Sequence, residues 1–169
     1  MAALYIIVGL VALQRLAELA LARRNTAWLL SEGAVESGAR HYPLFVALQT
    51  AWLAAIVFFA PDEAGVEVWF FLALLFLQAC RIWVIVSLGR FWTTRIISLP
   101  GAPLVRRGAY RFARHPNYLV VIGEIAILPL VFGEFEVALV FSILNILLVR
   151  HRIRVEEAAL SERIAEPTA

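Results

Sequence analysis

Five apolar blocks constrain this chain more than any other feature of its sequence. They run from about Ala2 to Ala22, Leu44 to Ala60, Val68 to Leu88, Tyr118 to Phe132 and Phe135 to Val149. Only 17% of the 169 residues are charged, against about a quarter in soluble domains. Since apolar blocks of this kind suit the hydrocarbon core of a bilayer, the sequence predicts an all-α integral membrane protein with about five transmembrane helices.

The last two blocks are short and lie close together. Fifteen helical residues reach only about 22 Å, against roughly 30 Å of hydrocarbon. Gly133 and Glu134 separate the two blocks. We therefore expect a short helical hairpin that starts below the headgroups or does not fully cross the bilayer.

The distribution of arginine predicts the orientation of these helices. Cytoplasmic loops are enriched in Lys and Arg. Arginines lie between blocks one and two, between blocks three and four, and after block five, whereas the other two loops hold acidic residues and no arginine. The N-terminus is thus expected outside and the C-terminus in the cytoplasm, as in a multi-pass protein of a bacterial inner membrane.

The chain is expected to form one membrane domain, with no Pro-, Gly- or Ser-rich linker. Three transmembrane helices would occupy residues 1–88, a cytoplasmic or interfacial segment 89–117, and a helical hairpin with a C-terminal tail 118–169. Its single cysteine, Cys80, and three scattered histidines predict neither an internal disulfide nor a metal site. Nothing predicts binding to nucleic acid, and a homodimer is left open.

Four ionisable residues interrupt the apolar blocks. Counted from the cytoplasmic ends, Glu18, Arg81 and Glu124 fall at similar depths, and Arg15 lies one turn from Glu18. Such side chains usually pair with one another or mark a functional site. We expect a buried cluster in which Arg81 pairs with Glu18 or Glu124. A structural ion pair and, for Glu124, a catalytic role are both open interpretations.

The segment from Arg90 to Tyr118 carries the densest polar chemistry. Its arginines and aromatic residues suit the membrane interface, and on composition alone it could simply be a loop attracted to anionic lipid. Its end is more specific: in Arg114-His115-Pro116-Asn117-Tyr118, Pro116 favours the first turn of a helix and places His115 just before it. A helix N-terminus offers free N–H groups and partial positive charge, which suit a carboxylate.

These motifs resemble the isoprenylcysteine carboxyl methyltransferase family. The pieces are Gly108-Ala109-Tyr110-Arg111, the Arg114–Tyr118 motif, a short apolar hairpin, and Arg150-His151-Arg152-Ile153-Arg154-Val155-Glu156-Glu157. Arg15-Leu16-x-Glu18 and Phe91-Trp92-Thr93-Thr94-Arg95 resemble a short bacterial branch. That branch is associated with O-methylation of long-chain alkylpyrones or alkylresorcinols.

The resemblance implies an S-adenosylmethionine-dependent O-methyltransferase, with S-adenosylhomocysteine as product. It implies a cofactor held between the His115 segment and the C-terminal helix, with these candidate binding residues: Tyr110, Arg111, His115, Pro116, Tyr118, Glu156 and Glu157. Candidate catalytic residues are Arg95, Arg114, Glu124, Arg150 and Arg154. Trp92 and Asn145 are candidates for binding the substrate, and for Asn145 a hydrogen bond between helices is an alternative.

The acceptor implied is a lipophilic molecule, either a prenylcysteine-type carboxylate or an enolic or phenolic hydroxyl, among membrane lipids. A carboxylate needs no base, and a nearby arginine favours the ionised form of an enol or phenol. Two other functions compete with this one. A nicotinamide-dependent membrane reductase of the sterol-reductase type can carry a similar RHPxY-like region, and a non-catalytic adaptor would use the basic segment to bind lipid.

Overall fold

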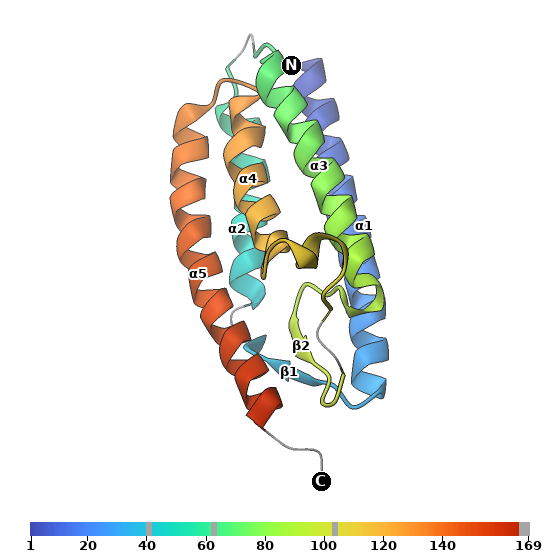
Figure 1. The fold of residues 1–169 in the computed structure, drawn as a ribbon. Coiled ribbons are helices and arrows are strands. Elements are labelled where there is room, and N and C mark those ends of the chain that lie inside the picture. The colour runs from blue at the N-terminus through green and yellow to red at the C-terminus, as the bar shows by residue number, and fades with distance from the viewer. Residues whose placement is uncertain (40–41, 62–63, 103–104, 166–169) are drawn as a thin grey trace.

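The computed structural model describes residues 1–39, 42–61, 64–102 and 105–165, with side chains through Ala158. Five α-helices lie roughly side by side in one bundle (Figure 1). They are α1 (Ala2–Ser31), α2 (Tyr42–Phe59), α3 (Val68–Leu88), α4 (Pro116–Leu130) and α5 (Phe135–Ala165). Two 3-10 turns, η2 (Gly89–Phe91) and η3 (Gly108–Arg111), lie between α3 and α4.

Three stretches among the described residues are long and apolar enough to cross a membrane. They are Ala2–Ser31, Tyr42–Phe59 and Val68–Phe91, and the apolar helix Pro116–Leu130 is shorter. Large apolar side chains are exposed along these helices, for example Trp69 at 82% and Phe76 at 69%. An exposed apolar surface of this kind fits lipid as the surrounding solvent, and the chain is accordingly an all-helical membrane protein apart from one small ribbon.

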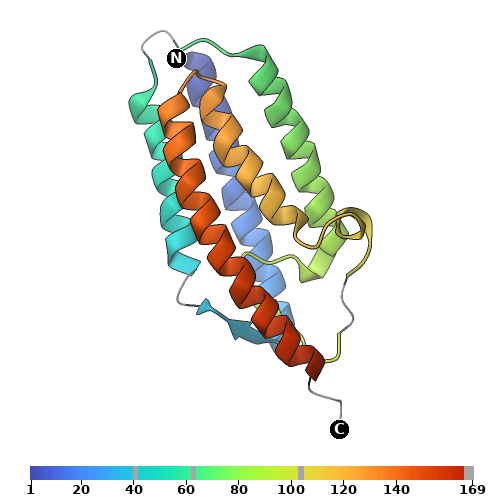
Figure 2. The same cartoon turned by 60° about the vertical axis from the view of Figure 1, so that its left-hand side comes forward.

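That ribbon was not predicted from the sequence. Strands β1 (Val35–Ser37) and β2 (Ile96–Ser98) pair antiparallel, with Glu36 opposite Ile97. The ribbon lies at the end of the bundle where the last turns of α5 are found (Figures 1 and 2). It joins the connection that follows α1 to the connection that follows α3, and we call this end of the bundle the site end.

Two helices run further than the apolar blocks that predicted them. Helix α1 continues past Ala22 to Ser31, and α5 continues past Val149 to Ala165. The extension of α1 is held by Asn25, which is buried and whose Nδ2 donates to the carbonyl oxygens of Gly89 and Trp92. Apolar composition thus locates the part of a helix that faces lipid. The helix can extend beyond that part where tertiary contacts, such as those of Asn25, hold it.

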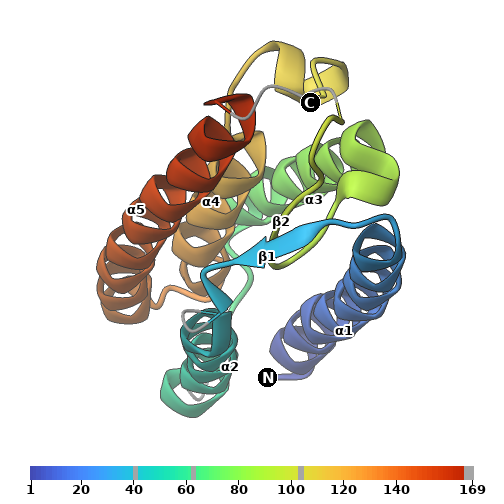
Figure 3. The same cartoon turned by 90° about the horizontal axis from the view of Figure 1, so that it is seen from below.

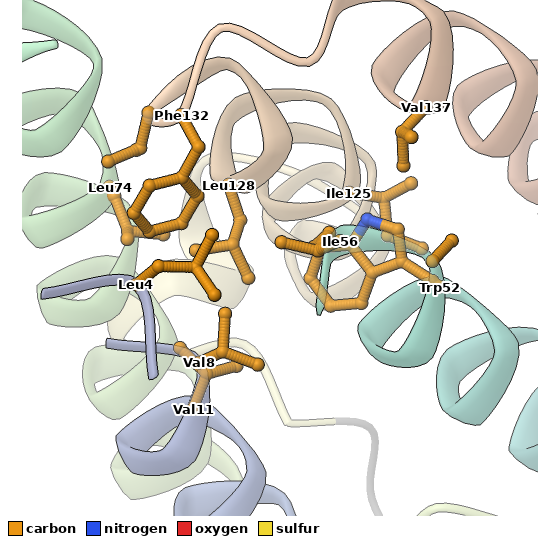
Figure 4. Close-up of a cluster of buried hydrophobic side chains, with 12 residues drawn as sticks. Leu4, Val8, Val11, Trp52, Ile56, Leu74, Ile125, Leu128, Phe132 and Val137 are labelled. Atoms are coloured by element: carbon orange, nitrogen blue, oxygen red, sulfur yellow. The ribbon is translucent and has the colours of Figure 1, made fainter. Parts of the chain in front are cut away.

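The apolar core lies in the half of the bundle away from the ribbon. Leu4, Trp52, Ile56 and Leu128 are fully buried there, and side chains from all five helices meet in this cluster (Figure 4). A backbone hydrogen bond of 2.9 Å from Glu67 N–H to the Val131 carbonyl ties the start of α3 to the end of α4. This packing fixes the helices at one end and leaves their other ends to frame the site.

Candidate functional site

The structure brings the start of α4 and the last turns of α5 together at the site end. Pro116 is the first residue of α4 and His115 its N-cap, as the motif predicted. The Tyr118 hydroxyl donates to Glu156 Oε2 at 2.5 Å. The two segments are 38 residues apart in sequence, so only the α4–α5 hairpin places them in contact.

His115 faces the same carboxylates. Its Nε2 lies 3.5 Å from Glu157 Oε1 and its Nδ1 lies 4.0 Å from Glu156 Oε2. The imidazole and the Tyr118 ring are neighbours, with centroids 5.6 Å apart. Both His115 and Glu156 keep part of their side chains exposed, at 20% and 30%, so this cluster is open to a water-soluble ligand.

Arg152 completes the cluster, and sequence reasoning did not select it. Its Nε donates to the Tyr118 hydroxyl at 2.9 Å, and its Nη2 donates to the Thr94 carbonyl at 2.6 Å. It precedes Glu156 by four residues, so both lie on one face of α5. That i,i+4 spacing was the available signal, and it separates Arg152 from its exposed neighbours Arg150 and Arg154. We call His115, Tyr118, Arg152, Glu156 and Glu157 the hairpin cluster.

Tyr110 approaches the cluster from η3. Burial raises the pKa of the Tyr110 hydroxyl above its usual value, and the nearby Glu156 carboxylate raises it further. The phenol therefore stays protonated at neutral pH and can donate a hydrogen bond. Its ring packs against the buried group of Val84, Ala109 and Val120.

Two hydrogen bonds to Ser87, in the last turn of α3, hold η3 in this position. The Ser87 hydroxyl accepts a hydrogen bond of 3.1 Å from Ala109 N–H, and the Ser87 carbonyl accepts one of 3.1 Å from Arg107 Nε. Gly108 lies between these two contacts with φ +56°, and a Cβ there would lie 2.0 Å from Ser87 Oγ. Glycine is therefore required for the close approach that sets the position of Tyr110.

A shallow open depression adjoins Arg152 on the ribbon side. Its lining includes Glu36, Tyr42, Phe45, Arg95 and Arg152. Arg95 stacks over Tyr42 at 5.1 Å and pairs with Glu36 at 3.0 Å, while Arg152 stacks over Phe45 at 4.9 Å. Flat rings and guanidinium groups at one surface suit an amphiphilic molecule with an acidic oxygen.

The four ionisable residues of the apolar helices form a separate, buried network. Arg81 donates to Glu18 through Nε and Nη2, each at 2.5 Å, and to Glu124 through Nη1 at 2.8 Å. Arg15 bridges the same two carboxylates, at 3.0 Å to Glu18 and 2.7 Å to Glu124. The expected buried cluster is confirmed. Glu124 Oε1 is buried without a hydrogen-bond partner among the described residues, and the catalytic role of Glu124 stays a prediction.

The other residues predicted from the sequence as candidate site residues are not part of the hairpin cluster. Trp92 is buried, and its carbonyl oxygen accepts the hydrogen bond from Asn25. Asn145 is fully buried in α5, and neither of its amide atoms has a hydrogen-bond partner among the described residues. The side chains of four arginines are exposed and form no ion pair within the described part of the chain: Arg111, Arg114, Arg150 and Arg154.

Comparison with known proteins agrees with this picture. A model of the isoprenylcysteine carboxyl methyltransferase (ICMT) family matches residues 69–162, which include the whole hairpin cluster. The uncharacterized protein YpbQ of Bacillus subtilis is 35% identical over 162 residues, covering 94% of this chain and 96% of its own length. An uncharacterized protein of Haemophilus influenzae is 29% identical over 157 residues, or 87% of this chain and 88% of its own. No solved structure matches the chain significantly.

Proposed function

Since the chain belongs to the isoprenylcysteine carboxyl methyltransferase (ICMT) family, whose membership indicates a membrane methyltransferase, we propose that it is an S-adenosylmethionine-dependent O-methyltransferase of a lipophilic acceptor. The observation that carries the proposal is the hairpin cluster. It joins an imidazole, a tyrosine, an arginine and two carboxylates in a partly exposed site next to a helix N-terminus.

The residues present fit the cofactor group by group. Glu156 and Glu157 are acceptors suited to its amino group, and the faces of Tyr118 and Tyr110 suit its sulfonium. The start of α4 suits its carboxylate. At that point Asn117 Oδ1 is buried without a hydrogen-bond partner among the described residues, which fits a polar ligand because buried polar atoms are normally paired.

The chemistry that the cofactor supplies when bound is an electrophilic methyl group on sulfur, which an oxygen nucleophile displaces. The protein's own residues bind, orient and exclude water. Arg152 places positive charge beside the depression, which favours the ionised form of an acidic oxygen there, whereas the charge of Arg95 is paired with Glu36, which lines the same depression. His115 and Tyr118 hold the two carboxylates of α5 in place at the start of α4.

For the acceptor we propose the depression lined by Tyr42, Phe45, Arg95 and Arg152 as the place of its polar head. Arg152 belongs to both the depression and the hairpin cluster, so an acceptor oxygen bound here would lie beside the cofactor residues. A prenylcysteine-type carboxylate and the hydroxyl of an alkylpyrone or alkylresorcinol remain the two acceptor classes. The apolar tail would lie in the bilayer, with the water-soluble cofactor entering from the cytoplasm.

For the membrane arrangement we propose five crossings with the N-terminus outside, the C-terminus in the cytoplasm and a bacterial inner membrane as the location. Three of the helices are long and apolar enough on their own. The apolar first half of α5 and the shorter α4 would cross as a hairpin. In this arrangement the site end faces the cytoplasm, and the arginines of the loops and of the second half of α5 lie on that side.

The test is calorimetric binding of S-adenosylhomocysteine to the detergent-purified protein. Tyr118→Phe removes the hydroxyl that bonds Glu156 and Arg152, and we expect a loss of affinity of about tenfold, on the order of 1.4 kcal/mol for hydrogen bonds to charged groups. The matched control is Tyr5→Phe. Tyr5 is 53% exposed and lies near the N-terminus of α1, far from the hairpin cluster. This variant should bind the ligand as the wild type does.

Absence of binding to a folded wild-type protein would overturn the proposal. Binding of a nicotinamide dinucleotide instead would favour the reductase. Binding of neither ligand, together with retention of anionic lipid, would favour the adaptor.

A further inference from the structure

A cluster of arginine and aromatic side chains lies where the last turns of α1 meet the end of α3. The Arg90 guanidinium lies 5.3 Å above the Trp28 ring, and the Phe91 ring meets the same indole edge-on at 6.2 Å. The Arg107 guanidinium lies beside Gly89, which directly precedes Arg90: a Cβ on Gly89 would be 3.7 Å from Arg107 Nη2. We call Trp28, Arg90, Phe91 and Arg107 the arginine corner. It shares no residue with the hairpin cluster.

No acidic side chain in the described part of the chain neutralises the positive charge of the corner. The sequence holds no Asp or Glu between Glu67 and Glu124. Neither Arg90 nor Arg107 forms an ion pair within the described ranges. Arg107 bonds the Ser87 carbonyl through Nε alone, so its two Nη groups remain as donors.

Exposed apolar side chains continue from the corner along the outside of α3. Ile82 is 59% exposed, Val86 68% and Trp83 47%, and the Trp83 ring lies 5.9 Å from that of Phe112, which is 77% exposed. Seen along the bundle from the site end, the neighbouring ends of α1 and α3 lie at its periphery (Figure 3). Unpaired guanidinium groups above an apolar flank match the two parts of a phospholipid: an anionic phosphate and acyl chains.

We propose that the arginine corner binds the phosphate of an acidic phospholipid, with the acyl chains along the exposed flank of α3. Arg90 and Arg107 supply charge-assisted donors for the phosphate oxygens. The Trp28 indole makes a cation–π contact with Arg90. Tryptophan is also typical of the depth at which lipid headgroups lie. Aromatic residues beside arginines at this level favour a lipid over a soluble anion, because only a lipid fills both the polar and the apolar parts.

The position of the corner gives the lipid a structural effect. Arg90 lies in η2 and Arg107 directly precedes η3, which carries Tyr110. A phosphate held by both would join the two ends of the connection between α3 and η3. The proposal is independent of the methyltransferase assignment, since it concerns a different set of residues.

The experiment is native mass spectrometry of the full chain in detergent with equimolar phosphatidylglycerol and phosphatidylcholine. We expect the wild type to retain phosphatidylglycerol preferentially. Arg90→Gln should lower that preference about fivefold, and Arg90→Gln with Arg107→Gln about 30-fold, since each substitution removes a charge-assisted hydrogen bond to the phosphate of about 1 kcal/mol. The Arg90 side chain contacts the Trp28 ring, whereas Arg107 holds the Ser87 carbonyl, so we expect the single variant to keep its fold even if the double variant does not.

The matched control is Arg150→Gln with Arg154→Gln, which removes the same charge from exposed positions of α5. It should keep the preference of the wild type. An equal loss in this control would show that total charge, and not the corner, attracts the lipid. Equal retention of both lipids by the wild type would also overturn the proposal.

Discussion

Arg81 shows what a single residue contributes inside this bundle. It is buried and bonded to two carboxylates, Glu18 and Glu124, from different helices. Arg81→Leu would leave these carboxylates with Arg15 as their only cation among the described residues. Since breaking a buried pair strands a charge, we expect the free energy of unfolding to fall by about 3–5 kcal/mol, measured by unfolding in sodium dodecyl sulfate.

The control for Arg81→Leu is Arg95→Gln. Arg95 also pairs with a glutamate at 3.0 Å, but 44% of its side chain is exposed. An exposed pair contributes about 0–1 kcal/mol. Equal effects of the two substitutions would mean that water reaches the network and that the ion pairs are not buried in the folded protein.

At the residue scale, the sequence predicted the site in part. His115, Tyr118 and Glu156 were selected because a motif and a helix start point to them, and the structure brings them together. Arg150 and Arg154 were selected and Arg152 was not, although all three arginines follow the apolar block and could equally be topological charges. Its i,i+4 spacing from Glu156 was the signal available in the sequence, and the packing of α5 against α4, which brings Arg152 to Tyr118, confirms that it differs from the exposed Arg150 and Arg154.

At the scale of elements, η3 depends on the close approach of Gly108 to α3. Gly108→Ala adds a Cβ that would lie 2.0 Å from Ser87 Oγ, at a φ of +56° that side chains rarely adopt. We expect η3 to shift, because such strain costs on the order of 1–3 kcal/mol. Tyr110 would move with it, and affinity for S-adenosylhomocysteine would fall about tenfold in calorimetry.

A second substitution separates the steric cause from a general defect. Ser87→Gly in the Gly108→Ala background removes both side-chain atoms within 2.8 Å of the new Cβ, and part of the affinity should return. Gly65→Ala is the neutral comparison, since nothing lies within 4 Å of a Cβ there. If the double variant binds no better than Gly108→Ala, the contact with Ser87 does not set the position of Tyr110.

The apolar blocks predicted some helix ends correctly and missed others, and the structure shows why. The third block was predicted as Val68 to Leu88, and α3 has those bounds because Gly89, at φ +57°, ends it where the apolar run ends. The end of α1 was missed because Arg23, Arg24 and Asn25 interrupt its apolar pattern and a tertiary contact from Asn25 to Trp92 holds the extension. For α5, the apolar pattern ended at Val149, and only the family resemblance implied a helix beyond it. The ribbon was missed because three-residue strands leave almost no periodic signal.

At the scale of the whole molecule, five crossings place successive loops on alternate sides of the membrane. In a Cys80→Ala background, which removes the only cysteine, we expect Gly65→Cys and Glu136→Cys to react with a membrane-impermeant maleimide from outside. Ser31→Cys should react only from inside. Glu136 is exposed directly after the α4–α5 turn, so its labelling reports whether the short α4 crosses.

Labelling of Glu136→Cys and Ser31→Cys from the same side would contradict five crossings. It would mean that the α4–α5 hairpin enters the membrane and returns. The hairpin cluster does not depend on this outcome, because its contacts lie at the site end in either case.

The hairpin cluster also has a consequence for how the protein is made. Its residues come from the start of α4 and from the second half of α5, which the ribosome synthesises after every other helix of the described chain. During translation, α1 to α3 can enter the membrane while Tyr118 still lacks Arg152 and Glu156. The nascent chain therefore carries no assembled cluster, and the site comes into existence only as the last helix leaves the ribosome and folds back onto α4.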